Sequence, residues 1–305
     1  MSDLLKKLPQ VRGIYRTDAE LKNWFNITTK AEVLFRPKDV SDLQNFLQKV
    51  SKEIPVTILG AASNVIIRDS GIAGVTIRLG REFAQISHDE NLIKVGAACL
   101  CGNVALYSKN AALANLEFLT GIPGSVGGAI AMNAGCYGSD VSQTLINATA
   151  VDFNGNLVEL KNSDNLSESD FEFSYRKNKI AKDFIFVEAV FKGEKSDSEL
   201  ISKKINEFNK KRETTQPIRA KTGGSTFKNP LDQTTKKSWE LIDESGCRGL
   251  KNKDAQMSKK HCNFMINNGN ASAQDLIDLG NEVKKIVKEK TNINLEWEIK
   301  ILGKF

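Results

Sequence analysis

The stretch TGIPGSVGGAIAMNAGCYG, residues 120–138, decides the interpretation of the whole chain. This glycine segment holds six glycines among mostly small residues. Glycine adopts positive φ without a steric penalty and lets another group come close to the main chain. We therefore expect its backbone N–H groups to face a flat, polar or phosphorylated ligand. From the spacing alone, a tight loop between packed elements is an equally good interpretation.

The glycine segment does not match the G-x-G-x-x-G of a dinucleotide-binding turn, because Pro123 interrupts it and no helix is expected to follow. A second turn, GAASN at residues 60–64, follows a short apolar strand. Ser63, Asn64 and Ser125 add side-chain hydrogen-bonding groups to the two turns. Together the turns predict a groove for a phosphate-bearing cofactor. Neither contains the Gly-Lys-Ser/Thr of a Walker loop, which argues against ATP or GTP hydrolysis.

The length and composition are those of a soluble globular protein. The 305 residues suffice for two or three compact domains, and 40% hydrophobic and 26% charged residues are ordinary values. No apolar run is long enough to span a membrane, and the N-terminal residues lack the pattern of a secretory signal. We therefore expect a cytoplasmic protein without membrane insertion.

The five cysteines are odd in number and irregularly spaced, which favours reduced thiols over a disulfide framework. Cys99 and Cys101 form a C-x-C pair, but two histidines offer few further ligands, so no metal is expected. The net charge of +6 is modest, and its densest run is KNKDAQMSKK at residues 251–260. This run fits either a solvated loop or a contact with a nucleotide phosphate. Because aromatic residues are not interleaved with it, no nucleic-acid partner is expected.

Short strands and helices alternate along the chain, which predicts an α+β or α/β organisation. Strands are expected at residues 31–36, 55–59, 74–79, 91–95, 171–176, 183–191, 261–266 and 295–303, and a hairpin at 146–153 and 156–160 around Asn154-Gly155. Helices are expected after Asp39 or Ser41, at 102–115, at 199–212 with Leu200, Ile201, Ile205 and Phe208 facing inwards, at 239–244, and after Ser272, which forms a capping box with Asp275. The polar residues 192–198 are interpreted as a domain boundary.

Ser225 is the first candidate for chemistry, in the serine loop KTGGSTFKNP at residues 221–230. Two glycines precede it and leave its hydroxyl on an open, turning backbone, as a nucleophile or proton donor requires. A capping serine in a glycine turn is an equally good interpretation. Because G-x-S-x-G is missing, a serine hydrolase is not favoured.

Two further candidates lie near expected strand ends. Tyr175 and Arg176 end one strand, and Glu296 and Glu298 share a face of the last strand. Paired strand glutamates are usually a solvent-exposed face. A glutamate buried beside an arginine is instead an acid–base or electrostatic candidate.

In their order along the chain, GAASN, GIPGSVGGAIAMNAGCYG, SYR, TGGSTFKNP, HCNFMINNG and LEWEIK resemble the MurB family, the UDP-N-acetylenolpyruvoylglucosamine reductases of bacterial peptidoglycan synthesis. The resemblance covers nearly the whole chain. No inserted segment follows SYRKN, and in this the chain is similar to the shorter, type II branch of the family. It implies an α+β protein with an FAD-binding region of the p-cresol methylhydroxylase type, residues 1–192, made of two α/β subdomains at about 1–80 and 81–192. A substrate-binding α/β domain, residues 193–294, follows. A C-terminal strand, residues 295–305, returns to the active site.

The resemblance also implies the reaction. NADPH reduces FAD, and the reduced flavin then passes a hydride to the enolpyruvyl group of UDP-N-acetylglucosamine enolpyruvate, giving UDP-N-acetylmuramate for the cell wall and so serving cell shape and division. By the same resemblance, Ser225 is the proton donor, Arg176 and Glu298 stabilise the carboxylate intermediate, and Tyr175 and Asn229 bind substrate. The enzyme is expected to act as a monomer. The implied FAD-binding residues are Gly60, Ala61, Ala62, Ser63, Asn64, Gly121, Ile122, Pro123, Gly124, Ser125, Gly128 and Ala131.

Three positions depart from the family pattern. Ala62 stands where the phosphate turn usually has its second glycine, Thr28-Thr29 replace a Gly-Gly, and Asp254 replaces a glycine near the expected nucleotide. The implied catalytic positions are intact, so cofactor affinity is more in doubt than activity. Two alternatives stay open: a flavoprotein of the same fold with another sugar-nucleotide or alcohol substrate, and a non-catalytic binder of UDP-sugar or nucleic acid that uses residues 251–260.

Overall fold

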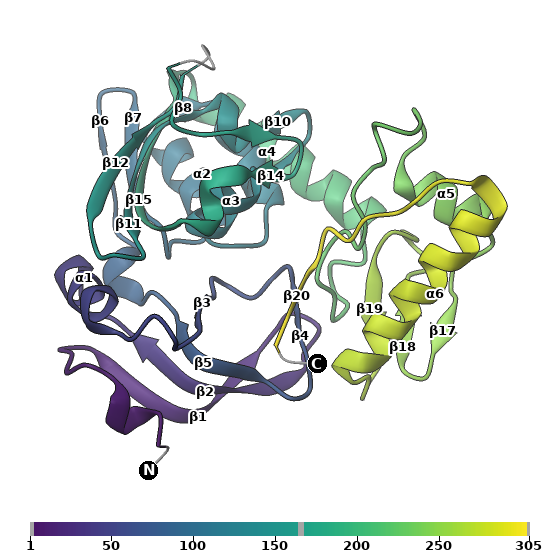
Figure 1. Cartoon of the computed structure of the whole chain (residues 1–305). Helices are drawn as coiled ribbons and strands as arrows, with labels where there is room; N and C mark the ends of the chain where they lie inside the picture. Colours follow the sequence, from purple (N-terminus) through teal and green to yellow (C-terminus); the bar gives the residue numbers. More distant parts are fainter. Residues whose placement is uncertain (1–2, 164–167, 304–305) are drawn as a thin grey trace. The chain divides into compact units, whose positions relative to one another are not determined.

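The computed structural model describes residues 3–163 and 168–303 (Figure 1). The chain forms two compact units, each assembled from separated stretches. Unit 1 comprises Met1–Asp18, Glu32–Ala61 and Gly74–Lys210, and unit 2 comprises Ala19–Ala31, Ala62–Ala73 and Lys211–Phe305. The predicted domain limits stay a prediction, and residues 1–2, 164–167 and 304–305 of those ranges lie outside the described part.

A four-stranded sheet near the N-terminus has the strand order β1 (Ile14–Lys22), β2 (Thr28–Arg36), β5 (Ile72–Ile77) and β3 (Val56–Ile58). The strands predicted at 31–36, 55–59 and 74–79 are present, but β1 was not predicted. Helix α1 (Val40–Lys49) begins after Asp39, whose side chain accepts a hydrogen bond from the Asp42 N–H. Its apolar residues Leu43, Phe46 and Leu47 are buried, and the ring centres of Phe46 and Phe35 are 4.6 Å apart.

Unit 1 also contains a five-stranded antiparallel sheet (Figure 1), with the order β12 (Leu157–Lys161), β11 (Leu145–Asp152), β15 (Phe184–Lys192), β7 (Leu92–Gly96) and β6 (Ile86–Asp89). The hairpin predicted around Asn154-Gly155 is confirmed. Gly155 has a φ of +82°, and the Asp152 carboxylate accepts the N–H groups of Asn154 and Asn156, both at 2.8 Å.

Helices cover this sheet and share its core. Apolar residues of β7, β11 and β15 pack with α2 (Cys101–Asn110), α3 (Val126–Met132) and α4 (Ser198–Thr215). The prediction that Leu200 faces inwards is wrong, because its side chain is 64% exposed while Ile201 and Ile205 are buried. The apolar stripe of α4 follows the 3.6-residue period through positions 201, 205 and 208, and position 200 lies about 100° around the helix from position 201, outside that stripe.

Unit 2 packs α6 (Ala273–Thr291) and α5 (Ser238–Glu244) with three short antiparallel strands, β17 (Lys251–Asn252), β18 (Ala255–Met257) and β19 (Met265–Asn267). Figure 1 shows α6 alongside these strands. The last strand, β20 (Lys300–Leu302), pairs in parallel with β4 (Val65–Ile67). The core of the unit includes Phe25, Ile27 and Ile66 from its two N-terminal stretches.

Three predicted strands are much shorter than expected. The one predicted at 261–266 is β19 only, and the one at 295–303 is β20 with an isolated bridge at Trp297. The one at 171–176 is the short β13 (Phe173–Ser174), paired with β14 (Lys177–Asn178). Each segment buries apolar residues in irregular backbone, such as Phe171, Cys262 and Ile299, and the sequence pattern does not distinguish such residues from those of a strand. The remaining short strands are β8 (Leu113–Ala114), β9 (Gly135–Cys136), β10 (Ser139–Asp140) and β16 (Glu194–Lys195), and the 3₁₀ helices are η1 (Leu5–Lys7), η2 (Arg81–Phe83), η3 (Glu117–Gly121), η4 (Val141–Gln143) and η5 (Lys179–Lys182).

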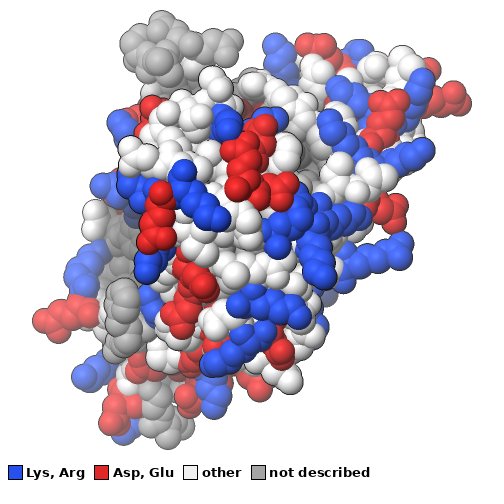
Figure 2. Space-filling model, turned by 90° about the vertical axis from the view of Figure 1, so that its right-hand side faces the viewer, with Lys and Arg blue, Asp and Glu red and all other residues white. Residues whose placement is uncertain are grey.

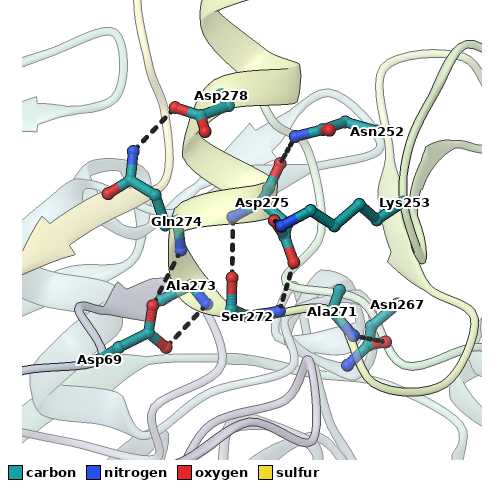
Figure 3. Close-up of polar contacts among 10 residues, drawn as sticks. All are labelled: Asp69, Asn252, Lys253, Asn267, Ala271, Ser272, Ala273, Gln274, Asp275 and Asp278. Atoms are coloured by element: carbon teal, nitrogen blue, oxygen red, sulfur yellow. Dashed lines mark hydrogen bonds and ion pairs between the residues drawn. The ribbon is translucent and has the colours of Figure 1, made fainter.

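Two carboxylates hold the N-terminus of α6 (Figure 3). The predicted capping box is confirmed: the Asp275 N–H donates to Ser272 Oγ at 3.1 Å, and the Ser272 N–H donates to Asp275 Oδ2 at 3.0 Å. Asp69 adds a second cap, because its carboxylate accepts the N–H groups of Ala273 and Gln274 at 3.0 and 3.2 Å. Four N–H groups lack an intrahelical partner at any helix start, and these contacts satisfy all four at the start of α6, at residues 272–275.

Candidate active site

The glycine segment contains a helix that was not predicted. Helix α3 begins after Ser125, and the N–H groups of Val126 and Gly127 donate to the carbonyls of Cys99 (2.9 Å) and Ala97 (2.8 Å). Tertiary hydrogen bonds thus stabilise a helix whose glycine-rich sequence has low intrinsic propensity. Of the predicted FAD residues, Ile122, Pro123 and Gly124 lie between η3 and α3, and Gly128 and Ala131 lie within α3.

Two of the predicted FAD-binding segments meet at Gly60 and Ser125. A Cβ added at Gly60 would lie 2.6 Å from Ser125 Oγ, so no larger residue fits there without movement. Ser125 and Leu100 form an isolated antiparallel β-bridge. The hydrogen bonds on either side of it run from Cys101 N to Gly124 O and from Val126 N to Cys99 O. Because this is the non-hydrogen-bonded position of an antiparallel pair, the N–H of Ser125 points away from residue 100.

Ala62 adopts a left-handed backbone conformation. Its φ is +54°, its side chain is 5% exposed, and its carbonyl accepts the N–H of Trp24 at 3.2 Å. A glycine has no penalty in this conformation, whereas an alanine does. The departure noted in the sequence therefore falls on a position whose backbone suits glycine.

Arg176 and Tyr175 form the turn between β13 and β14. Arg176 has a φ of +55°, and its Nη2 donates to the carbonyl of Gly135 in the glycine segment at 2.6 Å. Its guanidinium carbon lies 5.5 Å from the centre of the Tyr175 ring. Asn133 Nδ2 donates to Ser174 O at 3.3 Å, and Asn178 Nδ2 donates to Ile130 O at 3.2 Å. These bonds hold the hairpin against α3.

In unit 2 the serine loop lies between β19 and the C-terminal segment, residues 295–303. Ser225 forms an isolated antiparallel β-bridge with Phe264 on one side, and Phe227 forms another with Trp297 on the other side. The N–H of Glu298 donates to Thr226 O at 2.8 Å. Thr226 directly follows Ser225. This hydrogen bond therefore joins the backbones of the two predicted catalytic residues, Ser225 and Glu298.

Asn64 joins this group, because its Nδ2 donates to Glu298 O at 3.1 Å and its carbonyl accepts the Lys300 N–H at 3.0 Å. Asn229, a predicted substrate residue, accepts the N–H of Ser238 at 3.0 Å through Oδ1 and so holds the start of α5. The structure thus gathers the predicted residues into two groups. Gly60, Ser125, Tyr175 and Arg176 belong to unit 1, and Asn64, Ser225, Asn229 and Glu298 belong to unit 2.

Two residues that the sequence did not single out hold these groups. The buried Asn263 side chain donates to Phe227 O at 2.9 Å and accepts the Phe227 N–H at 3.0 Å, as a neighbouring strand would. The Tyr137 ring stacks on Phe208 of α4 at 4.2 Å, and its hydroxyl donates to Phe208 O at 3.0 Å. Asn263 lies in the HCNFMI motif and Tyr137 in the NAGCYG motif, and this position was the one signal in the sequence that could have indicated their role.

The lysine-rich residues 251–260 are tied into unit 2. Lys253 Nζ lies 2.7 Å from the Asp275 carboxylate (Figure 3), and hydrogen bonding to Lys253 is the main cause that lowers the pKa of Asp275. The Asp254 side chain accepts the N–H of Asn270 at 2.8 Å. On the face shown in Figure 2, lysines and arginines are interspersed with aspartates and glutamates. Lys253, the residue before Asp254, therefore contacts the capping carboxylate of α6.

The remaining sequence features are also located. The five cysteines, all within the described part of the chain, form no disulfide, and burial raises the pKa values of Cys99, Cys101, Cys247 and Cys262. The described residues contain no group of three or more His, Cys, Asp or Glu side chains able to hold a metal ion. Within residues 3–163 and 168–303, no helix has the length and apolar character needed to cross a membrane.

The chain matches two protein-family models: the FAD binding domain over residues 31–161, and the C-terminal domain of UDP-N-acetylenolpyruvoylglucosamine reductase over residues 216–302. The UDP-N-acetylenolpyruvoylglucosamine reductase of Rickettsia typhi is 46% identical over 300 residues, covering 98% of this chain and 99% of the relative. That of Wolbachia pipientis subsp. Culex pipiens is 47% identical over 305 residues, covering 99% and 100%. The crystal structure of the Thermus caldophilus reductase (MurB) superposes with a TM-score of 0.79 at 29% identity, covering 96% of this chain and 100% of that chain.

The α+β fold and the FAD-binding match define this chain as a flavin-dependent oxidoreductase. Relatives of this similarity and coverage identify it further. The chain belongs to the UDP-N-acetylenolpyruvoylglucosamine reductase family, an enzyme family of peptidoglycan synthesis, as its motifs predicted. The roles of its individual residues stay predictions.

Proposed function

We propose that this enzyme reduces the enolpyruvyl group of UDP-N-acetylglucosamine enolpyruvate to UDP-N-acetylmuramate with NADPH, and that Ser225, Arg176 and Glu298 are its catalytic residues. The observation that carries the assignment is the backbone junction of Ser225 and Glu298 in unit 2, where Glu298 N donates to Thr226 O. Ser225 and Glu298, which lie 73 positions apart in the sequence, are thereby joined at the positions that the family pattern assigns to chemistry. When bound, FAD accepts electrons from NADPH and supplies the hydride.

The residues around Gly60 and Ser125 fit a flavin. Gly60 leaves the space beside Ser125 Oγ free of a side chain, and the N–H of Ser125 points away from its bridge partner. Ser125 therefore offers both a hydroxyl and an N–H to an anionic group. We assign the pyrophosphate contact to Ser125 with Gly60, Ala61, Ala62, Ser63 and Asn64, and the contact with the ring system to Gly121, Ile122, Pro123 and Gly124.

Arg176 is suited to hold the substrate carboxylate. Reduction of the enolpyruvyl double bond builds negative charge on that carboxylate, which a fixed guanidinium stabilises through charge-assisted hydrogen bonds. The Nη2 bond to Gly135 O and the turn at Tyr175 restrain the guanidinium before substrate binds. Restraint of this kind lowers the reorganisation needed in the transition state.

Ser225 is assigned to proton transfer. A serine hydroxyl is a weak acid, so it donates its proton only to a strongly basic carbon within hydrogen-bond reach. The Ser225–Phe264 bridge and the Thr226 N–H bond to Asn263 O at 2.7 Å hold the backbone of the serine loop at Ser225 and directly after it. We assign Glu298, whose N–H donates to Thr226 O, to the same catalytic group.

Further parts of the proposal concern the whole protein. We assign FAD binding to residues 1–192 and substrate binding to 193–294, with residues 295–305 returning to the site. We also propose that the enzyme is a cytoplasmic monomer, because every residue assigned to catalysis lies on this one chain. Light scattering of the purified protein measures that oligomeric state.

Replacing Ser225 with alanine tests the proton-transfer role in two anaerobic half-reactions. Reduction of the bound flavin by NADPH should be unchanged in Ser225→Ala. Reoxidation by UDP-N-acetylglucosamine enolpyruvate should slow by about 10² to 10⁴, the usual contribution of a positioned acid. Ser87→Ala, at an exposed site on β6, is the matched control and should match the unsubstituted protein in both steps. Equal slowing of both half-reactions by Ser225→Ala would contradict the assignment.

A further inference from the structure

Trp297, directly before Glu298, packs against a glycine inside α6. A Cβ added at Gly280 would lie 2.0 Å from Cη2 of the Trp297 ring and 2.5 Å from Cζ2. Glycine is unfavourable in a helix interior, yet Gly280 is buried in the middle of a 19-residue helix. The indole ring occupies the space that any other residue at position 280 would fill.

The same ring sits on the serine loop. Trp297 and Phe227 form a bridge whose flanking bonds run from Lys228 N to Glu296 O at 2.9 Å and from Glu298 N to Thr226 O at 2.8 Å. This is a non-hydrogen-bonded pair, in which side chains come closest, and the two ring centres are 5.2 Å apart. Phe227 is 1% exposed and belongs to the core that α6 lines.

The alternation of an extended backbone sets where Glu298 points. Trp297 faces α6, so its neighbours at 296 and 298 face the opposite side of the ladder. Glu296 agrees, since its side chain is 73% exposed. The position of the indole ring therefore determines both the direction of the Glu298 side chain and its position along the helix axis.

We propose that Trp297, seated on Gly280, is a positioning residue for the reductase reaction. Because Trp297 pairs with Phe227, its seat on α6 fixes the position of the backbone at Glu298 and Ser225 along the axis of that helix. This inference rests on the proposed function, which assigns chemistry to those two residues. Ordinary core packing would stabilise unit 2 without affecting the chemical step, and the two interpretations differ in kinetics.

A double-mutant cycle between Gly280→Ala and Trp297→Leu tests the proposal. Gly280→Ala introduces a methyl group into the ring and should slow substrate-dependent flavin reoxidation by about 10- to 100-fold, the effect of a misplacement of about 1 Å. Reduction by NADPH should be unchanged. In the Trp297→Leu background, where the shorter side chain leaves room for a Cβ, Gly280→Ala should add no further slowing.

Val287→Ala is the matched control, because it opens a cavity at a fully buried position two turns further along α6. It should lower the urea midpoint of the flavin-free protein at least as much as Gly280→Ala while leaving reoxidation unchanged. Substrate affinity, measured from the flavin absorbance change, should shift less than the reoxidation rate in Gly280→Ala.

The outcomes separate the two levels of the hypothesis. Equal slowing by Gly280→Ala in both backgrounds, or slowing by Val287→Ala in proportion to its lost stability, would overturn the positioning role. Glu298→Gln measures the proposed function directly. If Glu298→Gln leaves reoxidation unchanged, the catalytic assignment itself is wrong. If Glu298→Gln slows it and Gly280→Ala does not, only the positioning role of Trp297 is wrong.

Discussion

Single residues in this chain carry backbone conformations that the surrounding structure imposes. Ala62, Tyr137 and Arg176 all have positive φ, between +54° and +57°, although none is a glycine. Two of them, Ala62 and Arg176, stand at positions predicted to touch the cofactor or substrate. Such conformations cost about 1 to 2 kcal/mol for an L-residue, and they persist because neighbouring contacts determine them.

Ala62→Gly should stabilise the protein by about 0.5 to 1 kcal/mol, because the relief of left-handed strain exceeds the entropy that glycine adds to the unfolded chain. Urea unfolding of the flavin-free protein measures this change in the free energy of unfolding. Ala61→Gly is the control, since Ala61 has no positive φ, and it should destabilise by a similar amount. A loss of stability in Ala62→Gly as large as that in Ala61→Gly would contradict the strain.

At the scale of elements, the start of α6 joins separate stretches of unit 2. The start of α6 is held by Ser272, Asp275 and Asp69, and the last of these comes from residues 62–73. Asp275 is 6% exposed, and its pKa is lowered by Lys253 and Ser272. A carboxylate at a helix N-terminus is also favoured by the helix dipole.

Asp275→Asn should lower the free energy of unfolding at pH 7 by about 1 kcal/mol. Because the pKa of Asp275 in the folded state lies below its ordinary value of 3.8, this stabilisation is present above that value and is lost as the pH falls through the lowered pKa. Unfolding curves of both proteins between pH 7 and pH 3 should therefore converge in acid. Asp278→Asn, at an exposed site one turn later, should show little difference at either pH. A difference for Asp275→Asn that does not change with pH would contradict the role of its charge.

At the scale of the whole molecule, the chain crosses repeatedly between its two units. Unit 2 is completed by residues 19–31 and 62–73, which supply Phe25, Ile27 and Ile66 to its core and β4 as the partner of β20. The matched C-terminal family domain, residues 216–302, contains none of them. The sequence limits of a family domain and the folding unit therefore differ.

A fragment of residues 211–305 should consequently fail to fold on its own. It lacks three core side chains, the strand that pairs with β20, and the Asp69 cap of α6. Small domains bury a limited apolar surface and are only marginally stable, so the loss of these core contacts should leave the fragment unfolded. Circular dichroism should show no cooperative thermal transition for the fragment, in contrast to the full chain. A sharp transition and dispersed amide resonances in the fragment would contradict this view.

The sequence by itself determined the family, the FAD-binding character and the elements whose signals are local. The Asn154-Gly155 hairpin, the α1 face and the Ser272 capping box depend on neighbours a few residues apart, so their patterns survive without a tertiary context. Only the tertiary structure decided the rest. Helix α3 depends on carbonyls at 97 and 99, and the segment expected as a strand at 295–303 is held by the Glu298 N–H bond to Thr226 O and by the packing of Trp297 on Gly280. The glycines at 127 and 280 signal low helix propensity in the sequence, yet both lie in helices, where Ala97 and the Trp297 ring come close to the space that a side chain at each position would fill.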